Sequence, residues 1–244
     1  MNVTWVEKDA VPAEIARRVR PANIVLDVGP GIRPQKHVIP LIHICVEPFT
    51  PYIERIREGA GDDPRFVYLN STWRNGLKAL PDKSVDSVFA LDVIEHLEKE
   101  DGLELLREAR RVARRQVMIF TPLGYMAQDY DTPEKKDRWG MDGGFWQTHR
   151  SGWEPRDFDE DWAFIACRRY HEVDENDQPL DEPAGAFWAF LDLAEQNGAG
   201  DAALTAQYKR FRSLYYKRLA RRFLPRWVYS GLQRVKNSVF RQRA

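Results

Sequence analysis

Short apolar segments alternate with amphipathic ones through the first half of the chain. The apolar segments have the length and residue types of β-strands, and they cover residues 23–28, 41–46, 65–69, 87–91 and 116–121. Two intervening segments, 51–58 and 102–113, have helical patterns, and the second carries an apolar stripe broken by charged residues. Strands that alternate with helices in this way predict βαβ units and a mainly parallel sheet.

The pattern changes after the fifth predicted strand. Residues 123–160 are rich in Trp, Gly, Asp and Pro, and so long an irregular insertion in a compact domain is more often a lid or a binding loop than a simple connection. Beyond it, residues 162–170 and 186–191 have strand patterns and are joined by the turn-rich segment 175–182. These two segments predict an antiparallel hairpin that closes a Rossmann-like α/β sheet with helices on both faces.

Composition fits one domain with appendages. The chain has 244 residues, of which 43% are hydrophobic, and single α/β domains of roughly 200–250 residues are common. The chain shows no apolar run as long as a signal peptide or a membrane-spanning helix, so we expect a cytoplasmic protein. Two cysteines, Cys45 and Cys167, are too few for a disulfide framework or a Cys-based metal site, and we expect reduced core thiols.

Charge is distributed unevenly along the chain. After Asp201 there are 12 Lys and Arg residues and no Asp or Glu, whereas residues 1–201 have 25 basic and 37 acidic residues. Apolar residues recur at helical spacing on both sides of Pro225, so we expect a main domain over 1–201 and a basic extension of two amphipathic helices over 202–244. Such an extension fits three partners: the acidic body or a second subunit of a homo-oligomer, an anionic membrane surface, and, less well, nucleic acid.

A candidate ligand site begins where the first predicted strand ends. Asp27, Gly29 and Gly31 follow a run of apolar residues, and glycine lets the backbone turn tightly and approach a ligand. A dinucleotide fingerprint requires a third glycine at position 34, where this chain has Pro34. The carboxylate of Asp27 instead favours a ligand with positive charge, namely S-adenosyl-L-methionine with its ammonium and sulfonium groups.

Polar residues also end the next three predicted strands. Glu47 lies 20 residues after Asp27, at the place where an acid accepts hydrogen bonds from both hydroxyls of a ribose. Asn70 and Ser71 end the third strand, where they fit either an adenine edge or a simple turn. The fourth strand ends in the sequence Asp92-Val93-Ile94-Glu95-His96-Leu97.

Three motifs together resemble the class I S-adenosylmethionine-dependent methyltransferases of the broad type related to ubiquinone-biosynthesis enzymes. They are the Asp-x-Gly-x-Gly strand end, the approach Pro81-Asp82-x-Ser84-x-Asp86 and the turn that begins at Asp92. The resemblance covers about residues 22–124 and implies a seven-stranded sheet of order 3-2-1-4-5-7-6. It also implies a role for each site residue: Asp27, Gly29 and Gly31 hold the methionine end, Glu47 the ribose, Asn70 and Ser71 the adenine region, and Asp92 the methionine moiety near the acceptor.

The chain departs from the family pattern after the second glycine. Family members usually have another glycine where Arg33 stands, and Pro34 and Pro40 leave little room for a full first helix. We therefore expect an unusual turn at this end of the cofactor site.

Methyl transfer needs a nucleophile in line with the sulfonium methyl, and a hydroxyl or amine must also lose a proton. His96, His149 and His171 are candidate bases, of which we expect His96 or His149 to be catalytic. The sequence shows no cluster of His and carboxylate residues with metal-ligand spacing, so we expect no metal. The fifth strand exits through Thr121-Pro122-Leu123-Gly124, unlike the motif of enzymes that methylate the amino groups of bases, which favours a hydroxyl acceptor.

The acceptor is suggested only by weaker patterns. Aromatic residues of the insertion offer flat faces for a sugar or an aromatic ring, and they fit a small satellite core equally well. The segments 153–158 and 185–189 resemble methyltransferases of bacterial surface-polysaccharide synthesis. We therefore expect a glycan or small-molecule acceptor, with the basic extension placing the enzyme at the inner face of a membrane. Two alternatives remain: an RNA methyltransferase that uses the basic extension, and a non-catalytic partner subunit.

Overall fold

The computed structural model describes residues 2–130, 135–174 and 178–193, which lie within one compact unit, Met1–Gln196. The basic extension expected at 202–244, with its two helices, lies outside the described residues, as does its boundary at Asp201. Among the helices that the structure describes, none is both long and apolar enough to cross a bilayer.

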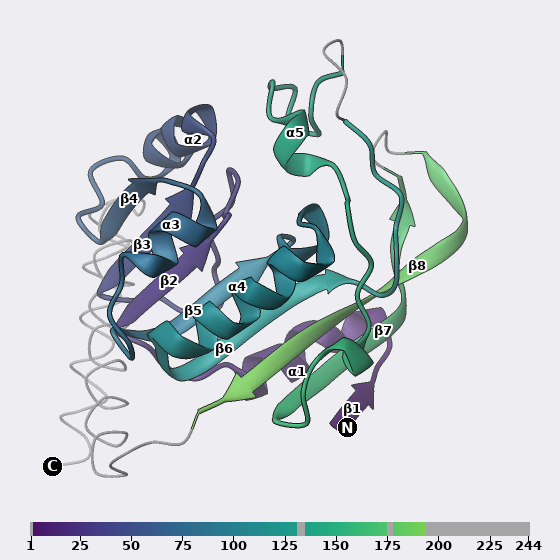
Figure 1. Cartoon of the computed structure of the whole chain (residues 1–244). Coiled ribbons are helices and arrows are strands. Elements are labelled where there is room, and N and C mark those ends of the chain that lie inside the picture. Colours follow the sequence, from purple (N-terminus) through teal and green to yellow (C-terminus); the bar gives the residue numbers. More distant parts are fainter. Residues whose placement is uncertain (1, 131–134, 175–177, 194–244) are drawn as a thin grey trace, which may run out of the picture. The chain divides into compact units, whose positions relative to one another are not determined.

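One eight-stranded sheet forms the centre of the domain (Figure 1). Its strands lie in the order β1-β7-β8-β6-β5-β2-β3-β4. Within the described ranges only β8 runs antiparallel to its neighbours, which are β6 and β7. The strands are β1 (Asn2–Trp5), β2 (Ile24–Val28), β3 (Ile42–Glu47), β4 (Phe66–Asn70), β5 (Val85–Leu91), β6 (Ala113–Pro122), β7 (Trp162–Val173) and β8 (Pro179–Asp192).

The sequence predicted seven of these strands, including the closing hairpin of β7 and β8. The sheet has eight strands where seven were expected, because β1 pairs in parallel with β7 at the sheet edge. This strand has only four residues and is largely exposed, so it carries no run of buried apolar residues. With β1 set aside, the order from β4 to β7 is 3-2-1-4-5-7-6 when β2 is counted as the first strand.

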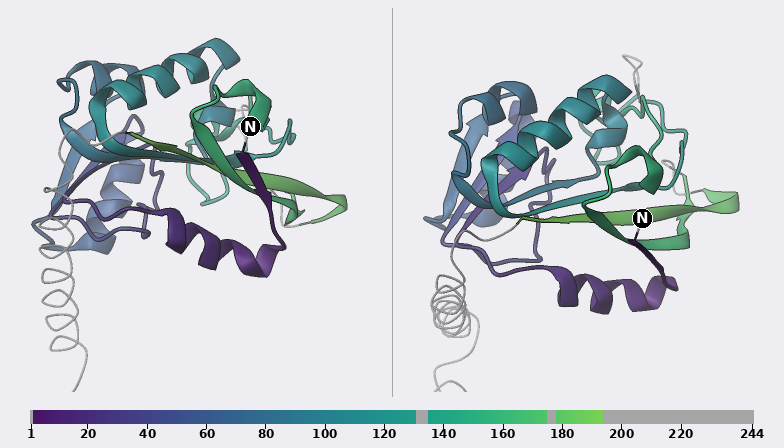
Figure 2. Two further views of the ribbon diagram at one scale, coloured as in Figure 1. Left: turned by 90° about the horizontal axis from the view of Figure 1, so that it is seen from below. Right: turned by 60° about the horizontal axis from the view of Figure 1, so that its bottom comes forward.

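Helices cover both faces of the sheet. Figure 2 shows α4 along one face and α1 along the other, and α3 contacts α4. The two predicted helices are confirmed as α2 and α4, whereas α1, α3 and α5 were not predicted. The helices are α1 (Val11–Arg18), α2 (Thr50–Ala60), α3 (Trp73–Lys78), α4 (Lys99–Val112) and α5 (Gly144–Gln147), with 3-10 turns η1 (Lys8–Ala10), η2 (Ile94–His96) and η3 (Pro155–Asp157).

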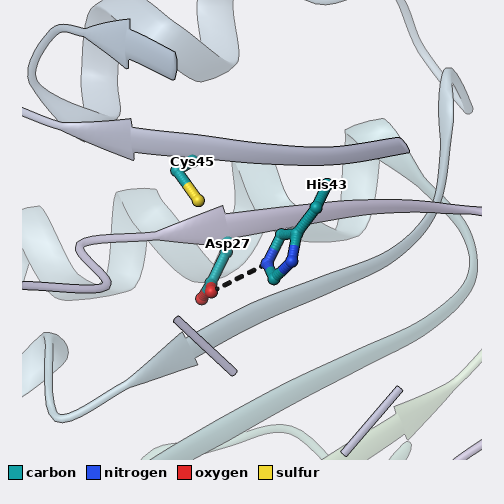
Figure 3. Close-up of side chains that lie close together, drawn as sticks. All are labelled: Asp27, His43 and Cys45. Atoms are coloured by element: carbon teal, nitrogen blue, oxygen red, sulfur yellow. Dashed lines mark hydrogen bonds and ion pairs between the residues drawn. The ribbon is translucent and has the colours of Figure 1, made fainter. Parts of the chain in front are cut away.

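No helix follows β2, as Pro34 and Pro40 indicated. Residues 29–41 instead form an irregular segment, because proline has no N–H to continue a helical ladder. Asp27 of β2 and His43 and Cys45 of β3 lie close together on one face of the sheet (Figure 3). The loop is anchored to this face by the backbone N–H of Gln35, which donates to Asp27.

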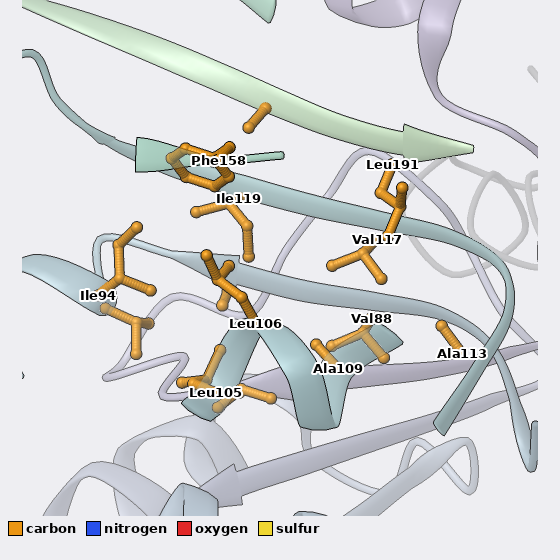
Figure 4. Close-up of a cluster of buried hydrophobic side chains, with 14 of the residues drawn as sticks. Val88, Ile94, Leu105, Leu106, Ala109, Ala113, Val117, Ile119, Phe158 and Leu191 are labelled. Atoms are coloured by element: carbon orange, nitrogen blue, oxygen red, sulfur yellow. The ribbon is translucent and has the colours of Figure 1, made fainter. Parts of the chain in front are cut away.

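The core lies between α4 and the middle of the sheet. Leu105, Leu106 and Ala109 of α4 pack toward Val88 of β5 and Val117 of β6 (Figure 4). Apolar residues recur on this helix at the spacing of one face, which is why α4 could be predicted from the sequence. Cys45 and Cys167 are buried free thiols, as expected. This core fixes the carboxyl ends of β2, β3 and β5, where the candidate site lies.

Candidate functional site

A cavity of about 530 Å³ opens at the carboxyl ends of the parallel strands. This volume is within the range of small-molecule sites, which is roughly 300–1,000 Å³. The cavity is lined by Val28, Gly29, Val46, Glu47, Pro48, Tyr52, Thr72, Trp73, Arg74, Asn75, Asp92, Val93, His96, Leu97, Glu98, Asp101, Phe145, Trp146, Gln147 and Arg150. Four of the predicted site residues are therefore at the cavity: Gly29, Glu47, Asp92 and His96.

The glycine turn after β2 is required by geometry. Gly29 and Gly31 have φ angles of 58° and 56°, a region that side chains with a Cβ avoid. A Cβ on Gly31 would lie 2.5 Å from the ring of Trp139, and one on Gly29 would lie 3.0 Å from Val93. The turn therefore lets the insertion pack directly on the end of β2.

Asp27 lies behind this turn and does not line the cavity. Its carboxylate is 2% exposed, and one oxygen accepts from the N–H of Gln35 at 2.8 Å and lies 3.0 Å from Nε2 of His43 (Figure 3). Burial raises the pKa of the neighbouring Cys45 thiol well above its usual range, so this thiol stays neutral. The structure thus places Asp27 where it fastens the 29–41 segment to the sheet, outside the lining of the cavity.

Glu47 reaches the cavity from the end of β3. Its side chain is 3% exposed, and its two oxygens accept from the N–H groups of Gly31 at 3.0 Å and Phe49 at 2.9 Å. Burial nevertheless raises the pKa of Glu47 to about 7, with the two N–H donors acting in the opposite direction. Each carboxylate oxygen has a further lone pair, so Glu47 fits the expected role as acceptor for two ribose hydroxyls.

Asn70 and Ser71 have a structural role at the end of β4. The Asn70 amide donates to the carbonyls of Glu47 and Pro48, both at 3.0 Å, and its oxygen accepts from Thr50. The Ser71 hydroxyl donates to the carbonyl of Thr72. Neither residue lines the cavity, so of their two expected roles the structure supports the turn.

The turn after β5 is strained at Asp92. This residue has a φ of 54°, an uncommon value for a residue other than glycine. Asp92 is open to the cavity on one side and enclosed by protein on the others. This enclosure raises the pKa of its carboxyl group to about 6, and the positive charge of Arg138 acts in the opposite direction. Asp92 therefore changes its charge close to neutral pH, at the wall of the cavity.

The insertion runs along this strained turn. The N–H groups of Arg150 and Ser151 donate to the carbonyl of Glu95 at 2.7 and 3.1 Å. The indole N–H of the fully buried Trp153 donates to the carbonyl of Ile94 at 3.0 Å. These hydrogen bonds hold the insertion against η2.

Both candidate bases lie in this contact. The rings of His96 and His149 are 4.8 Å apart between centroids. Burial and the neighbouring His149 lower the pKa of His96 to about 3, which leaves it a weak base near neutral pH. His149 is buried beside the cavity wall and does not line it. His171 on β7 likewise has its pKa lowered to about 4 by burial.

Several cavity residues come from the insertion or from α2, and the sequence could not place them at the cavity. Phe145, Trp146 and Arg150 come from the insertion, whose irregular pattern predicts no element that could place them. The guanidinium of Arg150 donates to the carbonyls of His96 and Phe145, so it fastens the rim to the turn. Tyr52 of α2 also lines the cavity and hydrogen-bonds to Asp137 of the insertion. The insertion therefore forms a wall of the cavity, as the expectation of a binding loop suggested.

The sheet has a glycine turn at the carboxyl end of one strand, and the next strand ends in an acidic residue that can accept hydrogen bonds from a ribose. These features define the Rossmann-like class of proteins that bind nucleotide cofactors. Within this class, residues 26–121 match the family model described as a methyltransferase domain. Residues 26–121 therefore form a methyltransferase domain, of the class I type that uses S-adenosyl-L-methionine. The cavity volume, the glycine turn and the carboxylates of Glu47 and Asp92 fit S-adenosyl-L-methionine, which carries a ribose and two positive groups.

The chain is also similar, at low identity, to several solved methyltransferase structures. The methyltransferase domain of bacterial CtHen1 is 17% identical, with 76% of this chain and 94% of that chain covered and a TM-score of 0.43. The same values hold for a SAM-dependent methyltransferase from Archaeoglobus fulgidus. The N-terminal domain of EvdMO1, solved with SAH and D-fucose, is 11% identical, with 77% and 82% covered and a TM-score of 0.46. No curated protein matches the chain.

Proposed function

We propose that this methyltransferase acts on a hydroxyl group of a glycan or small molecule. The observation that carries the proposal is Asp92, a carboxylate that lines the cavity and whose pKa is raised to about 6. Such a group is ionised at neutral pH and has a higher proton affinity than an ordinary carboxylate, which suits a base that takes a hydroxyl proton.

S-adenosyl-L-methionine, when bound, supplies an electrophilic methyl group on its sulfonium. Glu47 binds the ribose and thereby fixes the position of the methyl donor at the cavity wall. Asp92 accepts the acceptor's hydroxyl proton as the oxygen–carbon bond forms, and the sulfur keeps the electron pair of the broken bond. The chain's main contribution is therefore to position the acceptor and exclude water.

The acceptor side of the cavity is formed by Phe145, Trp146 and Gln147 at α5. Aromatic faces beside an amide suit the apolar face and hydroxyl edge of a sugar ring, which supports a glycan acceptor. The charge pattern of 202–244 supports a location at an anionic membrane surface, where its lysines and arginines each contribute on the order of 1 kcal/mol.

Transfer of labelled methyl groups tests this proposal. Full-length protein is incubated with methyl-labelled cofactor and, separately, with lipid-linked glycans, small phenols and tRNA. We expect label on the glycan or the phenol, in an ether that resists mild base. Label in tRNA would support the RNA alternative, and cofactor binding without transfer to any of the three would contradict a hydroxyl acceptor of these classes.

A further inference from the structure

A second group of chemically active side chains lies next to the cofactor cavity. Glu95 and His96 belong to η2, and His149 belongs to the insertion. Ligand atoms of these three residues all lie within 4.8 Å of one another. His149 lies 53 positions after His96 in the sequence, and the hydrogen bonds between residues 150–153 and η2 bring it to the other two residues. Sequence spacing gave no sign of this cluster, because the fold alone brings His149 to Glu95 and His96.

Glu95 is an unusual carboxyl group. It is 2% exposed, and neither of its oxygens makes a hydrogen bond of good geometry with the described residues, although the Thr121 hydroxyl and the Asp92 carboxyl group lie near enough to affect its pKa. Burial and the nearby charge of Asp92 raise its pKa well above the usual range. A buried carboxyl group without a partner is destabilising. A cation beside it removes this destabilisation, since it supplies the missing charge partner.

Both histidines are oriented by backbone carbonyls. Nδ1 of His149 lies 2.6 Å from the carbonyl oxygen of Met126, and Nδ1 of His96 lies 3.2 Å from that of Thr148. Since a carbonyl oxygen only accepts, each Nδ1 carries the proton and donates it. The lone pair of each ring then lies on Nε2. In metal-binding histidines, the ring nitrogen that does not bind the metal usually donates to a carbonyl or a carboxylate, and this contact fixes the ring's orientation. The Nδ1 atoms of His96 and His149 make such contacts.

We propose that Glu95, His96 and His149 bind a divalent first-row transition-metal ion such as Mn²⁺ or Zn²⁺. Two imidazole nitrogens and one carboxylate suit these ions better than Mg²⁺ or Ca²⁺, which prefer oxygen ligands. Bonds of about 2.0–2.2 Å to one ion place two ligand atoms at most about 4.4 Å apart. The ligand atoms of the three residues, with either ring nitrogen counted for each histidine, lie within 4.8 Å of one another, a little above this limit.

Three protein ligands leave coordination positions open. His96 lines the cavity, and Asp92 lies three residues from Glu95 at the same wall. An ion at this place faces the acceptor side of the cavity. We assign to it, on the basis of the proposed function, the binding of the acceptor's hydroxyl oxygen. There it would lower the pKa of that hydroxyl, so that the oxygen loses its proton to solvent and takes the methyl group as the bond between the methyl carbon and sulfur breaks.

Metal binding is tested first without cofactor or acceptor. Chelator-treated full-length protein is titrated calorimetrically with MnCl₂ and with ZnCl₂, and with CoCl₂ while the visible absorption of Co²⁺ is recorded. We expect saturable binding of one ion per chain and a Co²⁺ spectrum typical of mixed nitrogen and oxygen ligands. Each of the variants Glu95→Gln and His149→Asn should weaken binding by at least about tenfold. The matched control is His37→Asn, a histidine outside the cluster, which should bind as the natural chain does.

Thermal unfolding distinguishes a ligand from a structural residue. Since Glu95 is a buried carboxyl group without a hydrogen bond of good geometry, Glu95→Gln should unfold at the same or a higher temperature than the metal-free natural chain, and should lose the rise in midpoint that metal produces. If Glu95→Gln does not fold, His149→Asn provides the same measurement. Natural chain that shows no saturable binding up to about 1 mM ion, or variants that bind as tightly as it does, would overturn the proposal.

Activity is measured separately. With an identified acceptor, chelation should abolish methyl transfer while S-adenosylhomocysteine still binds, and added Mn²⁺ or Zn²⁺ should restore transfer. If no acceptor is methylated, the proposed function fails while the binding measurements still decide on the metal. Conversely, transfer that continues at full rate in excess chelator leaves the methyltransferase assignment intact and refutes the role given to the ion.

Discussion

Cofactor affinity should increase with pH through neutrality, because Glu47 must be ionised to accept both ribose hydroxyls. The pKa of this carboxyl group is raised to about 7 in the free protein. The ionised fraction then rises from about one-tenth at about pH 6 to about nine-tenths at about pH 8, so affinity should increase about tenfold over this range. Binding favours the ionised form and releases a proton.

The variant Glu47→Gln should bind the cofactor roughly 10- to 100-fold more weakly at about pH 8, since it loses hydrogen bonds to a charged group worth about 1.5–3 kcal/mol each. It should also lose the pH dependence. Calorimetric titration with S-adenosylhomocysteine at several pH values measures both effects. A suitable control is Glu100→Gln, which removes an exposed carboxylate of α4 outside the cavity.

Stability provides an independent measurement of the same carboxyl group. The pKa of Glu47 rises on folding from 4.5 to about 7, so the folded protein holds a proton that the unfolded chain releases. Stability without ligand should therefore fall as pH rises through this window, by up to about 3 kcal/mol, and Glu47→Gln should remove that fall. A variant that keeps the natural pH profile of affinity and of unfolding would refute both the ribose role and the raised pKa.

Three further changes have expected outcomes. Gly31→Ala should lower stability by more than about 1 kcal/mol and weaken cofactor binding, because the turn has positive φ and the new Cβ overlaps Trp139; thermal unfolding and calorimetry measure this. Asp27→Asn should lower the unfolding midpoint, because it weakens the contact with His43. It should change cofactor affinity by less than about threefold, or ~0.7 kcal/mol. Truncation after Asp201 should abolish co-sedimentation with anionic vesicles at low salt and leave cofactor binding intact; full-length chain that does not co-sediment refutes the membrane location.

The parallel core was predictable because its strands are buried on both faces and appear as continuous apolar runs. The elements that escaped prediction lack such a signal. α3 has only six residues, less than two turns, so its apolar positions show no period. β1 is largely exposed and obtains its partner from a strand about 160 residues later. In both cases the element depends on tertiary contacts that local sequence does not encode.

The site divides in the same way. Gly29, Glu47 and Asp92 were placed correctly at the cavity, because each ends a predicted parallel strand and these ends meet at one edge. Asp27 also lies near a strand end, yet its side chain contacts His43 and does not line the cavity. Which side of a strand end a residue occupies depends on register and on the loop that covers it. Here the prolines of the 29–41 segment determine that loop.

The sequence could not predict the cavity wall that η2 and the insertion form, because this wall depends on contacts between distant parts of the chain. Asp92 holds an unfavourable positive φ, a strain on the order of 1–3 kcal/mol that persists only when surrounding contacts fix it. Those contacts come from the insertion: the carbonyl of Glu95 accepts from Arg150 and Ser151, and that of Ile94 accepts from Trp153. The strain and its compensation thus lie more than 50 residues apart in the sequence. Strand ends of the Rossmann core form one wall of the cavity, and the insertion forms another only once it has docked. If the acceptor binds at the insertion wall, as we propose, two enzymes with the same strand-end motifs and different insertions should share a cofactor and differ in acceptor.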